Sequence, residues 1–184
     1  MLMRGFSLLE VLIAMAVSSI LLLGASRFLP ALQLGIMQQM HQQTLEDDLW
    51  QQVFTVAKHL QRAGFCAGES CSGAPLYLAA SGECLIARWD GNANGRWEVS
   101  PMEEADSIGF RLKLGVLETQ RGAQNCEGGG WHKMSDPTMV TVTRFRVTQA
   151  RQSGFPPEFV ISLSAITGRG ETASAQYSVT GYNL

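Results

Sequence analysis

One carboxylate, Glu10, lies inside an otherwise apolar segment and is the most unusual chemical group near the start of the chain. From Phe6 to Ser26 the sequence has 21 residues, and Glu10 is the single charged residue among them. A helix of that length spans roughly 31 Å at about 1.5 Å per residue, enough to cross a hydrocarbon core about 30 Å thick. A carboxylate at membrane depth costs on the order of 2.5 to 3.5 kcal/mol at the helix centre and less near the end. We therefore expect Glu10 to have a partner.

Two ordinary kinds of N-terminal segment fit this stretch less well. A cleaved secretory signal has an apolar stretch of about 7 to 15 residues that ends at a small-residue site. The run here is longer, and Gly24-Ala25-Ser26 matches such a site poorly. A plain membrane anchor explains the length of the run and the basic Arg4 before it, but it leaves Glu10 unexplained.

The stretch Arg4-Gly5-Phe6-Ser7-Leu8-Leu9-Glu10 resembles the class III signal of type IV pilins and type II secretion pseudopilins. The resemblance implies that a membrane-embedded prepilin peptidase cuts between Gly5 and Phe6, removes residues 1–5 as a leader and N-methylates Phe6. In an assembled filament the Glu10 carboxylate could then meet the Phe6 amine of a neighbouring subunit, because opposite charges attract strongly in a low dielectric. Residues 6–29 would form the membrane-spanning and assembly half of the N-terminal helix.

A second half of this helix is predicted over residues 30–64. Apolar residues recur at steps of three to five positions and glutamines and acids fill the other faces, which is typical of an amphipathic helix. Gly64 is the expected end, with cations in the last turns. Pro30 removes a backbone donor, so it should kink or locally melt the helix near the membrane boundary.

Residues 65–184 are predicted to form a globular antiparallel β head. Short apolar or alternating runs predict strands, with a bulge in the fifth because its alternation slips in phase, and with a hairpin turn at Gly168-Arg169-Gly170. The expected strands are Leu76 to Ala80, Cys84 to Trp89, Ser107 to Leu114, Val116 to Arg121, Met139 to Gln149, Glu158 to Thr167 and Thr172 to Gly181. The expected fold class is therefore α+β and pilin-like, with one long helix packed on an antiparallel sheet.

Composition and cysteines fit an exported, anchored domain. The chain has 14 basic and 16 acidic residues in 184, and loss of Arg4 with the leader leaves a slightly more acidic mature chain, which argues against nucleic acid as main partner. The four cysteines contain no C-x-x-C pair, so zinc is poorly supported and two disulfides are expected, with three possible connectivities. We favour Cys66 with Cys71 and Cys84 with Cys126; free buried thiols are the alternative.

One loop in the head suggests a metal. Asp90, Asn92, Asn94 and Gly95 match the first half of a D-x-[DN]-x-[DN]-G calcium loop, with Arg96 and Glu98 as the next ligand positions. The match fails at the twelfth position, which is Pro101 instead of a bidentate Glu. A weak Ca²⁺ site is one interpretation and a metal-free Asn/Gly turn is the other.

Catalysis has little support in the sequence. No nucleophile or acid pair lies at motif spacing near His41, His59 or His132, and each is expected at the surface or a helix end. We expect the chain to be the substrate of an enzyme and not an enzyme itself. Arg144 and Arg146 would share one strand face, and Phe145 between them could stack on a base, so a DNA-binding or adhesive pilus-tip module is an alternative function.

The residues around Phe54 to Gly64 and the closing Tyr177 to Leu184, with Gly5 to Leu12, resemble the enterobacterial prepilin peptidase-dependent protein B family. That family is related to J-type minor pseudopilins and W-type minor pilins. The resemblance implies a minor pilin that joins other minor and major pilins at the inner-membrane assembly platform and primes pilus assembly near the tip, with a periplasmic head on a single-pass anchor. A type II secretion minor pseudopilin is the alternative.

Overall fold

The computed structural model describes residues 7–99 and 104–184, in which one long helix precedes eight strands. The helix, α1, covers Leu8–Arg62. The chain divides into two compact units, one up to Gln43 and the other Thr44–Leu184. The pilin-like α+β class expected from the sequence is confirmed.

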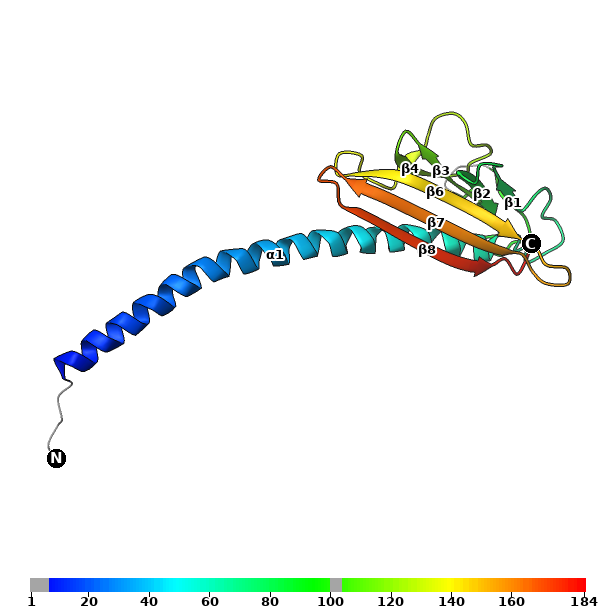
Figure 1. Cartoon of the computed structure of the whole chain (residues 1–184). Helices are drawn as coiled ribbons and strands as arrows, with labels where there is room; N and C mark the ends of the chain where they lie inside the picture. Colours follow the sequence, from blue (N-terminus) through cyan, green and yellow to red (C-terminus); the bar gives the residue numbers. More distant parts are fainter. Residues whose placement is uncertain (1–6, 100–103) are drawn as a thin grey trace. The chain divides into compact units, whose positions relative to one another are not determined.

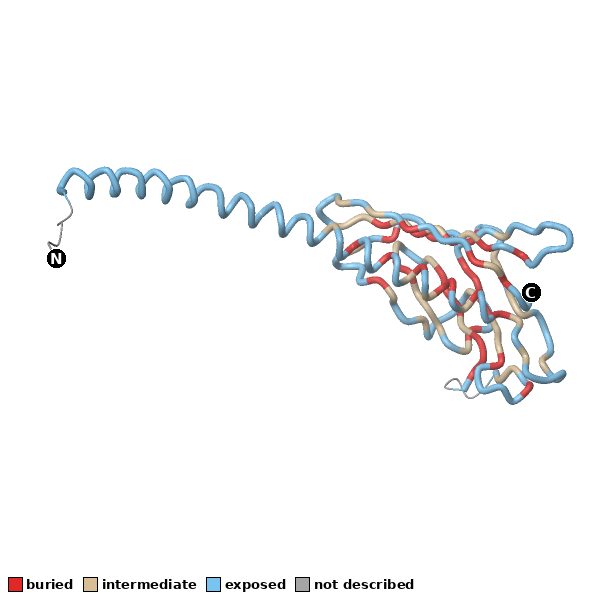
Figure 2. The backbone as a smooth tube through the Cα atoms, turned by 90° about the horizontal axis from the view of Figure 1, so that it is seen from below, coloured by how far each residue is buried: buried red, intermediate tan, exposed pale blue. Residues whose placement is uncertain are grey.

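In the first unit every described residue before Met40 lies in α1 or directly at its start and is exposed. Figure 2 shows this stretch as a continuous pale-blue coil. The helix runs through Pro30 without interruption, so it does not melt there, and the kink predicted at Pro30 stays a prediction. A proline inside a helix removes one hydrogen bond, yet the turns on both sides of Pro30 stay helical.

In the second unit α1 ends at Arg62, two residues earlier than predicted, because the chain turns at Gly64. Gly64 has φ +88°, and its N–H donates to the carbonyl of Arg88 at 2.8 Å instead of continuing the helix. A Cβ at this position would lie 2.1 Å from the carbonyl oxygen of Asn183. Only glycine therefore lets the helix end meet both β2 and the C-terminus.

Two antiparallel sheets follow, where the sequence predicted one. The first has five strands in the order β1 (Leu76–Leu78), β2 (Cys84–Arg88), β3 (Ser107–Lys113), β4 (Val116–Arg121) and β5 (His132–Lys133). The second has three, in the order β6 (Val140–Ala150), β7 (Glu158–Thr167) and β8 (Thr172–Thr180). The predicted bulge is confirmed, since the β6–β7 register shifts between Val142 and Arg144.

The two sheets are joined at β6, and one face of the end of α1 packs against them. The N–H of Val142 donates to the carbonyl of Gly115, and the N–H of Val147 donates to that of Gly82, at 2.8 and 2.9 Å. The largest fully buried side chains come from all three layers: Leu49, Leu60, Leu85, Phe110, Phe145 and Phe159. Figure 2 shows these buried segments gathered where α1 lies along the sheets.

Candidate functional site

The N-terminal segment that carries the predicted processing site is described from Ser7 onward. Gly5 and Phe6, the predicted cleavage and methylation residues, lie outside the described residues. Glu10 lies in the first turn of α1, and its Oε2 accepts a hydrogen bond from the N–H of Ser7 at 3.2 Å. Ser7 and Glu10 have the S-x-x-E spacing of a capping box, a signal that the sequence reading missed. Glu10 thus has a partner within its own chain.

The face of α1 around Glu10 carries both small and large side chains, with Val11, Met15 and Leu22 among the large ones. Glu10, Ala14 and Ser18 recur at every fourth position and border one shallow hollow on the helix surface. Small residues let a second helix approach closely. Among the described residues, α1 is the one helix that is long and apolar enough to cross a membrane, with a mean hydropathy of 2.3 in its most apolar window. The hydroxyls of Ser19 and Ser26 donate to carbonyls of the preceding turn, which satisfies them without water.

The predicted calcium loop folds around Asp90, whose side chain is only 2% exposed. Asp90 Oδ2 accepts the N–H groups of Ala67 at 3.0 Å and Gly95 at 2.8 Å, and Oδ1 accepts that of Asn94 at 3.0 Å. Asn92 Oδ1 accepts the N–H of Asn94, and Asn94 Oδ1 accepts that of Arg96. The loop therefore holds the predicted oxygen ligands together through its own backbone, and Ca²⁺ binding there stays a prediction.

A second buried carboxyl group, Asp106, joins this loop and was missed in the sequence. Its Oδ1 accepts the N–H of Gly91 at 3.0 Å and its Oδ2 accepts that of Glu98 at 3.2 Å. Burial, followed by its contact with the Glu98 carboxylate, raises the pKa of Asp106, whereas the hydrogen bond from Asp106 and then that from Asn94 lower the pKa of Glu98. Burial of Asp90 works to raise its pKa, but several backbone N–H donors outweigh burial and hold that pKa below its usual value. One acid of the group thus keeps its proton more readily than the others.

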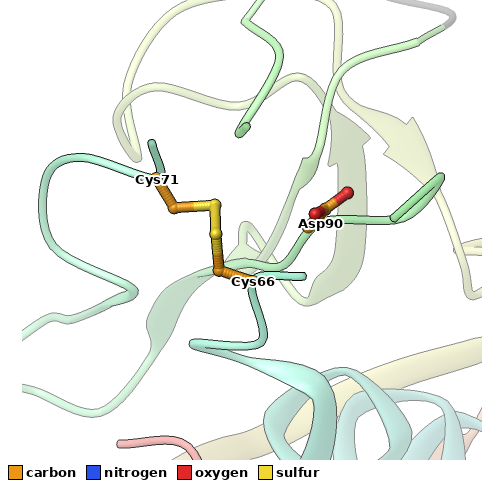
Figure 3. Close-up of side chains that lie close together, drawn as sticks. All are labelled: Cys66, Cys71 and Asp90. Atoms are coloured by element: carbon orange, nitrogen blue, oxygen red, sulfur yellow. A yellow bond between two sulfur atoms is a disulfide. The ribbon is translucent and has the colours of Figure 1, made fainter. Parts of the chain in front are cut away.

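Cys66, Cys71 and Asp90 place three potential metal-ligand atoms within 4.8 Å of one another (Figure 3). The two sulfurs are joined as a disulfide between Cα atoms 6.2 Å apart, so they present no thiolate to a metal. The disulfide instead closes the chain just after α1, next to the Asp90 loop.

The second disulfide, Cys84–Cys126, is confirmed and ties β2 to the long loop after β4. The same loop is held by Arg111 of β3, which was not singled out in the sequence. Its guanidinium donates to Glu118 Oε2 at 2.8 Å and to the carbonyl of Cys126 at 2.7 Å, and it lies 4.2 Å from the centre of the Trp131 ring. Arg111 is 6% exposed, so these contacts are buried and hold the loop against the first sheet.

Other side chains singled out in the sequence lie as follows. His59 is in the last turn of α1, at the helix end as predicted, and it is half-buried because its ring packs 4.9 Å from Trp89 and 5.6 Å from Phe110. Phe145 is 1% exposed and faces the core, so it cannot stack on a base, although Arg144 and Arg146 do lie exposed on either side of it. His41 and His132 are exposed, as predicted.

Comparison with known proteins identifies both parts of the chain. The family model described as "Prepilin peptidase-dependent protein B" matches residues 38–182, and the "Prokaryotic N-terminal methylation motif" matches residues 2–26. Prepilin peptidase-dependent protein B of Escherichia coli strain K12 is 52% identical over 183 residues, which cover 98% of this chain and 97% of that protein. No solved structure matches. The chain, whose methylation motif overlaps the start of an exposed apolar helix and whose head is disulfide-bonded, belongs to the prepilin peptidase-dependent protein B family.

Proposed function

We propose that this protein is a minor pilin that a prepilin peptidase processes and that then joins other minor pilins to prime type IV pilus assembly, near the tip of the filament. The N-terminal methylation motif over residues 2–26 supports the processing step. In this proposal residues 1–5 are removed, Phe6 becomes the methylated terminus, and the head of residues 65–184 is periplasmic. The inner membrane holds the subunit through residues 6–29 until assembly, and residues 30–64 connect this anchor to the head.

The observation that carries the proposal is the setting of Glu10. It lies at the start of an exposed apolar helix, and its side chain accepts a hydrogen bond from the N–H of Ser7. A single backbone donor compensates a carboxylate poorly within lipid. The amine that cleavage creates on a neighbouring Phe6 would supply the missing opposite charge, and Ala14 and Ser18 leave room for the neighbouring helix.

A processing experiment tests the first step. Replacement Gly5→Ala should prevent cleavage, because a side chain at that position obstructs the peptidase, and the precursor should persist as an unshifted band after gel electrophoresis. The Glu10→Leu variant should be cleaved normally. Normal cleavage of the unaltered chain in a strain without prepilin peptidase would overturn the proposal.

An assembly experiment separates the charge of Glu10 from its capping role. Glutamine can fill the third position of a capping box as glutamate does, but it carries no charge. We therefore expect both Glu10→Gln and Glu10→Leu to be processed and to lose pilus assembly, measured as sheared surface pili. Full assembly with Glu10→Gln would show that the charge is not what the filament requires.

A further inference from the structure

The three-stranded sheet ends in an edge strand, β8, which pairs on one side only among the described residues. The opposite edge, β6, is closed by hydrogen bonds to Gly82 and Gly115 of the first sheet. Within residues 7–99 and 104–184, β8 pairs with β7 alone, in the order β6-β7-β8. The outer side of β8 from Ser174 to Ser178 therefore presents backbone groups that do not pair with β7.

The register identifies which backbone groups face outward. At one end of the β7–β8 hairpin the N–H of Thr167 donates to the carbonyl of Glu171, and at the other the N–H of Gly181 donates to that of Pro157, both at 2.9 Å. Hydrogen-bonded and non-hydrogen-bonded pairs alternate along an antiparallel ladder. With Ile161 opposite Tyr177, the residues that bond to β7 are Ala173, Ala175, Tyr177 and Val179. The N–H groups of Ser174, Gln176 and Ser178 therefore point to the open edge.

This edge lacks the features that usually prevent strand pairing. Edge strands are commonly protected by charged residues, proline, bulges or short length. β8 is nine residues long, Thr-Ala-Ser-Ala-Gln-Tyr-Ser-Val-Thr, and has neither a charge nor a proline. Its register against β7 is unbroken from Thr180 to Thr172. It is thus a regular, uncharged template for another strand.

Beside this edge, α1 provides an exposed aromatic surface. The Tyr177 ring meets Phe54 edge-on at 5.1 Å, and Phe54 lies 5.5 Å from Trp50. We call these three side chains the aromatic floor. Tyr177 and Trp50 are each 37% exposed, and Phe54 is 50% exposed. Figure 1 shows β8 running along this part of α1. Every second side chain of a strand added to β8 would rest on the aromatic floor, because side chains alternate between the faces of a sheet.

The charges on α1 at the two ends of the floor differ in sign. Asp47 lies one turn before Trp50, and Lys58 lies one turn after Phe54, and both are exposed. An added strand that carries a basic residue near Asp47 and an acidic residue near Lys58 is complementary to this pattern. The surface therefore favours an added strand with alternate apolar side chains, and the two charges favour one orientation of that strand along β8.

We propose that the β8 edge and the aromatic floor dock an extended strand of another protein, which joins the sheet by β-augmentation. Its alternate side chains are apolar and cover Trp50 and Phe54, and its backbone pairs with Ser174, Gln176 and Ser178. A second copy of this chain fits worse, because it would bring its own Trp50 and Phe54 beneath its own β8, into the space the added side chains fill. This inference goes beyond the role in pilus assembly and does not depend on it.

Photo-crosslinking of the full-length chain in its own membrane tests the proposal. The photo-crosslinker benzoylphenylalanine replaces Tyr177 in one variant. In a control variant it replaces Phe155, an exposed loop residue. The double variant Gln176→Pro/Ser178→Pro removes two outward N–H groups and leaves the bonds to β7, since proline is tolerated where the N–H faces away from the sheet. Gln176→Ala/Ser178→Ala is the matched control that keeps both donors.

We expect an adduct from position 177 with a second protein, mapped by mass spectrometry to a segment of alternating apolar residues. Its yield should fall roughly tenfold or more with the proline pair, because two hydrogen bonds are lost, and stay unchanged with the alanine pair. An independent variant, Trp50→Gln/Phe54→Gln, leaves β8 intact and should lower the yield similarly.

Three results would overturn the docking surface: an adduct no stronger than that from position 155, a crosslinked dimer of this chain, or a yield that neither the proline pair nor the glutamine pair reduces. Thermal unfolding of each variant checks that the head is folded. If the proline double variant does not fold, the crosslinking yield of the Trp50→Gln/Phe54→Gln variant tests the proposal instead. Because none of these readouts uses cleavage or pilus formation, failure here is distinguishable from failure of the minor-pilin proposal.

Discussion

Protonation of His59 should limit the stability of the head in acid. The imidazole lies on α1 between Trp89 and Phe110, at ring distances of 4.9 and 5.6 Å. Burial lowers its pKa from 6.5 to about 4, and the nearby positive charges of Arg62 and Lys58 contribute in the same direction. Nδ1 is buried with no hydrogen-bond partner among the described residues. The folded head thus holds His59 in its neutral form.

The sign and size of the effect follow from linkage between protonation and folding. The pKa is lower in the folded than in the unfolded state, so the contribution of His59 to stability is complete above pH 6.5 and is lost as the pH falls towards 4. Each unit of pKa difference corresponds to about 1.4 kcal/mol, so the free energy of unfolding should fall by about 3 kcal/mol between pH 8 and pH 4 through this group alone.

Urea unfolding of the full-length chain in detergent, followed by tryptophan fluorescence at several pH values, measures this loss. His59→Leu is the matched variant because leucine fills the same apolar site and cannot titrate. Other carboxyl groups also titrate in acid, so the quantity to compare is the difference between the two proteins. We expect His59→Leu to keep about 3 kcal/mol more of its stability at pH 4 than the unaltered chain does. Parallel pH profiles for both proteins would refute the reasoning.

Three further predictions concern the head. Arg111→Leu should lower the free energy of unfolding by about 3 to 5 kcal/mol, because it leaves the Glu118 carboxylate, whose side chain is 15% exposed, without its cation. The double variant Arg111→Leu/Glu118→Leu should recover part of this loss, measured by urea unfolding. Replacing Cys84 and Cys126 by serine should lower the free energy of unfolding by about 4 kcal/mol, because their disulfide closes a loop with a separation of 42 residues. Replacing Cys66 and Cys71, at a separation of 5, should lower it by about 2 kcal/mol. Equal losses of stability in thermal unfolding would contradict the loop-closure account. Calorimetric titration with millimolar Ca²⁺ should release or absorb heat and raise the melting temperature, and Glu98→Gln should weaken both effects; no heat and no shift would remove the calcium prediction.

The strands could be read from the sequence with small errors in their ends, because alternation and turn residues are local signals. The bulge is an example: Val142 and Phe145 both face the core although three positions separate them, and the register shift lies between Val142 and Arg144. β5 was missed because His132 and Lys133 are two exposed residues with no apolar pattern. The division into two sheets was missed because backbone bonds at Gly82 and Gly115 create the junction, and these depend on contacts distant in sequence.

The surroundings of single polar residues were the harder part to predict. From its position near the end of a helix, His59 would be expected to lie in solvent. Its partial burial comes from Trp89, which follows β2, and from Phe110 in β3. Asp106 lies eight residues after Glu98, outside the calcium-loop pattern, and only the fold brings it to the N–H groups of Gly91 and Glu98. Both cases depend on packing between elements, which no local pattern in the chain records.

The capping box changes how Glu10 should be understood, since the single subunit already gives this carboxylate a hydrogen bond from Ser7. An N-terminal cap contributes about 1 kcal/mol. Under the proposed assembly, the Phe6 amine of a neighbour must exceed this contribution, and two unit charges about 4 Å apart attract by about 4 kcal/mol at an effective dielectric constant near 20. Exchange of the cap for the ion pair is therefore favourable where the helices exclude water. In bulk water the same pair attracts by only about 1 kcal/mol, so the exchange gives no net gain where water surrounds the terminus. The same residue can thus stabilise the helix end of the waiting subunit and select the assembled state once a processed neighbour is in place.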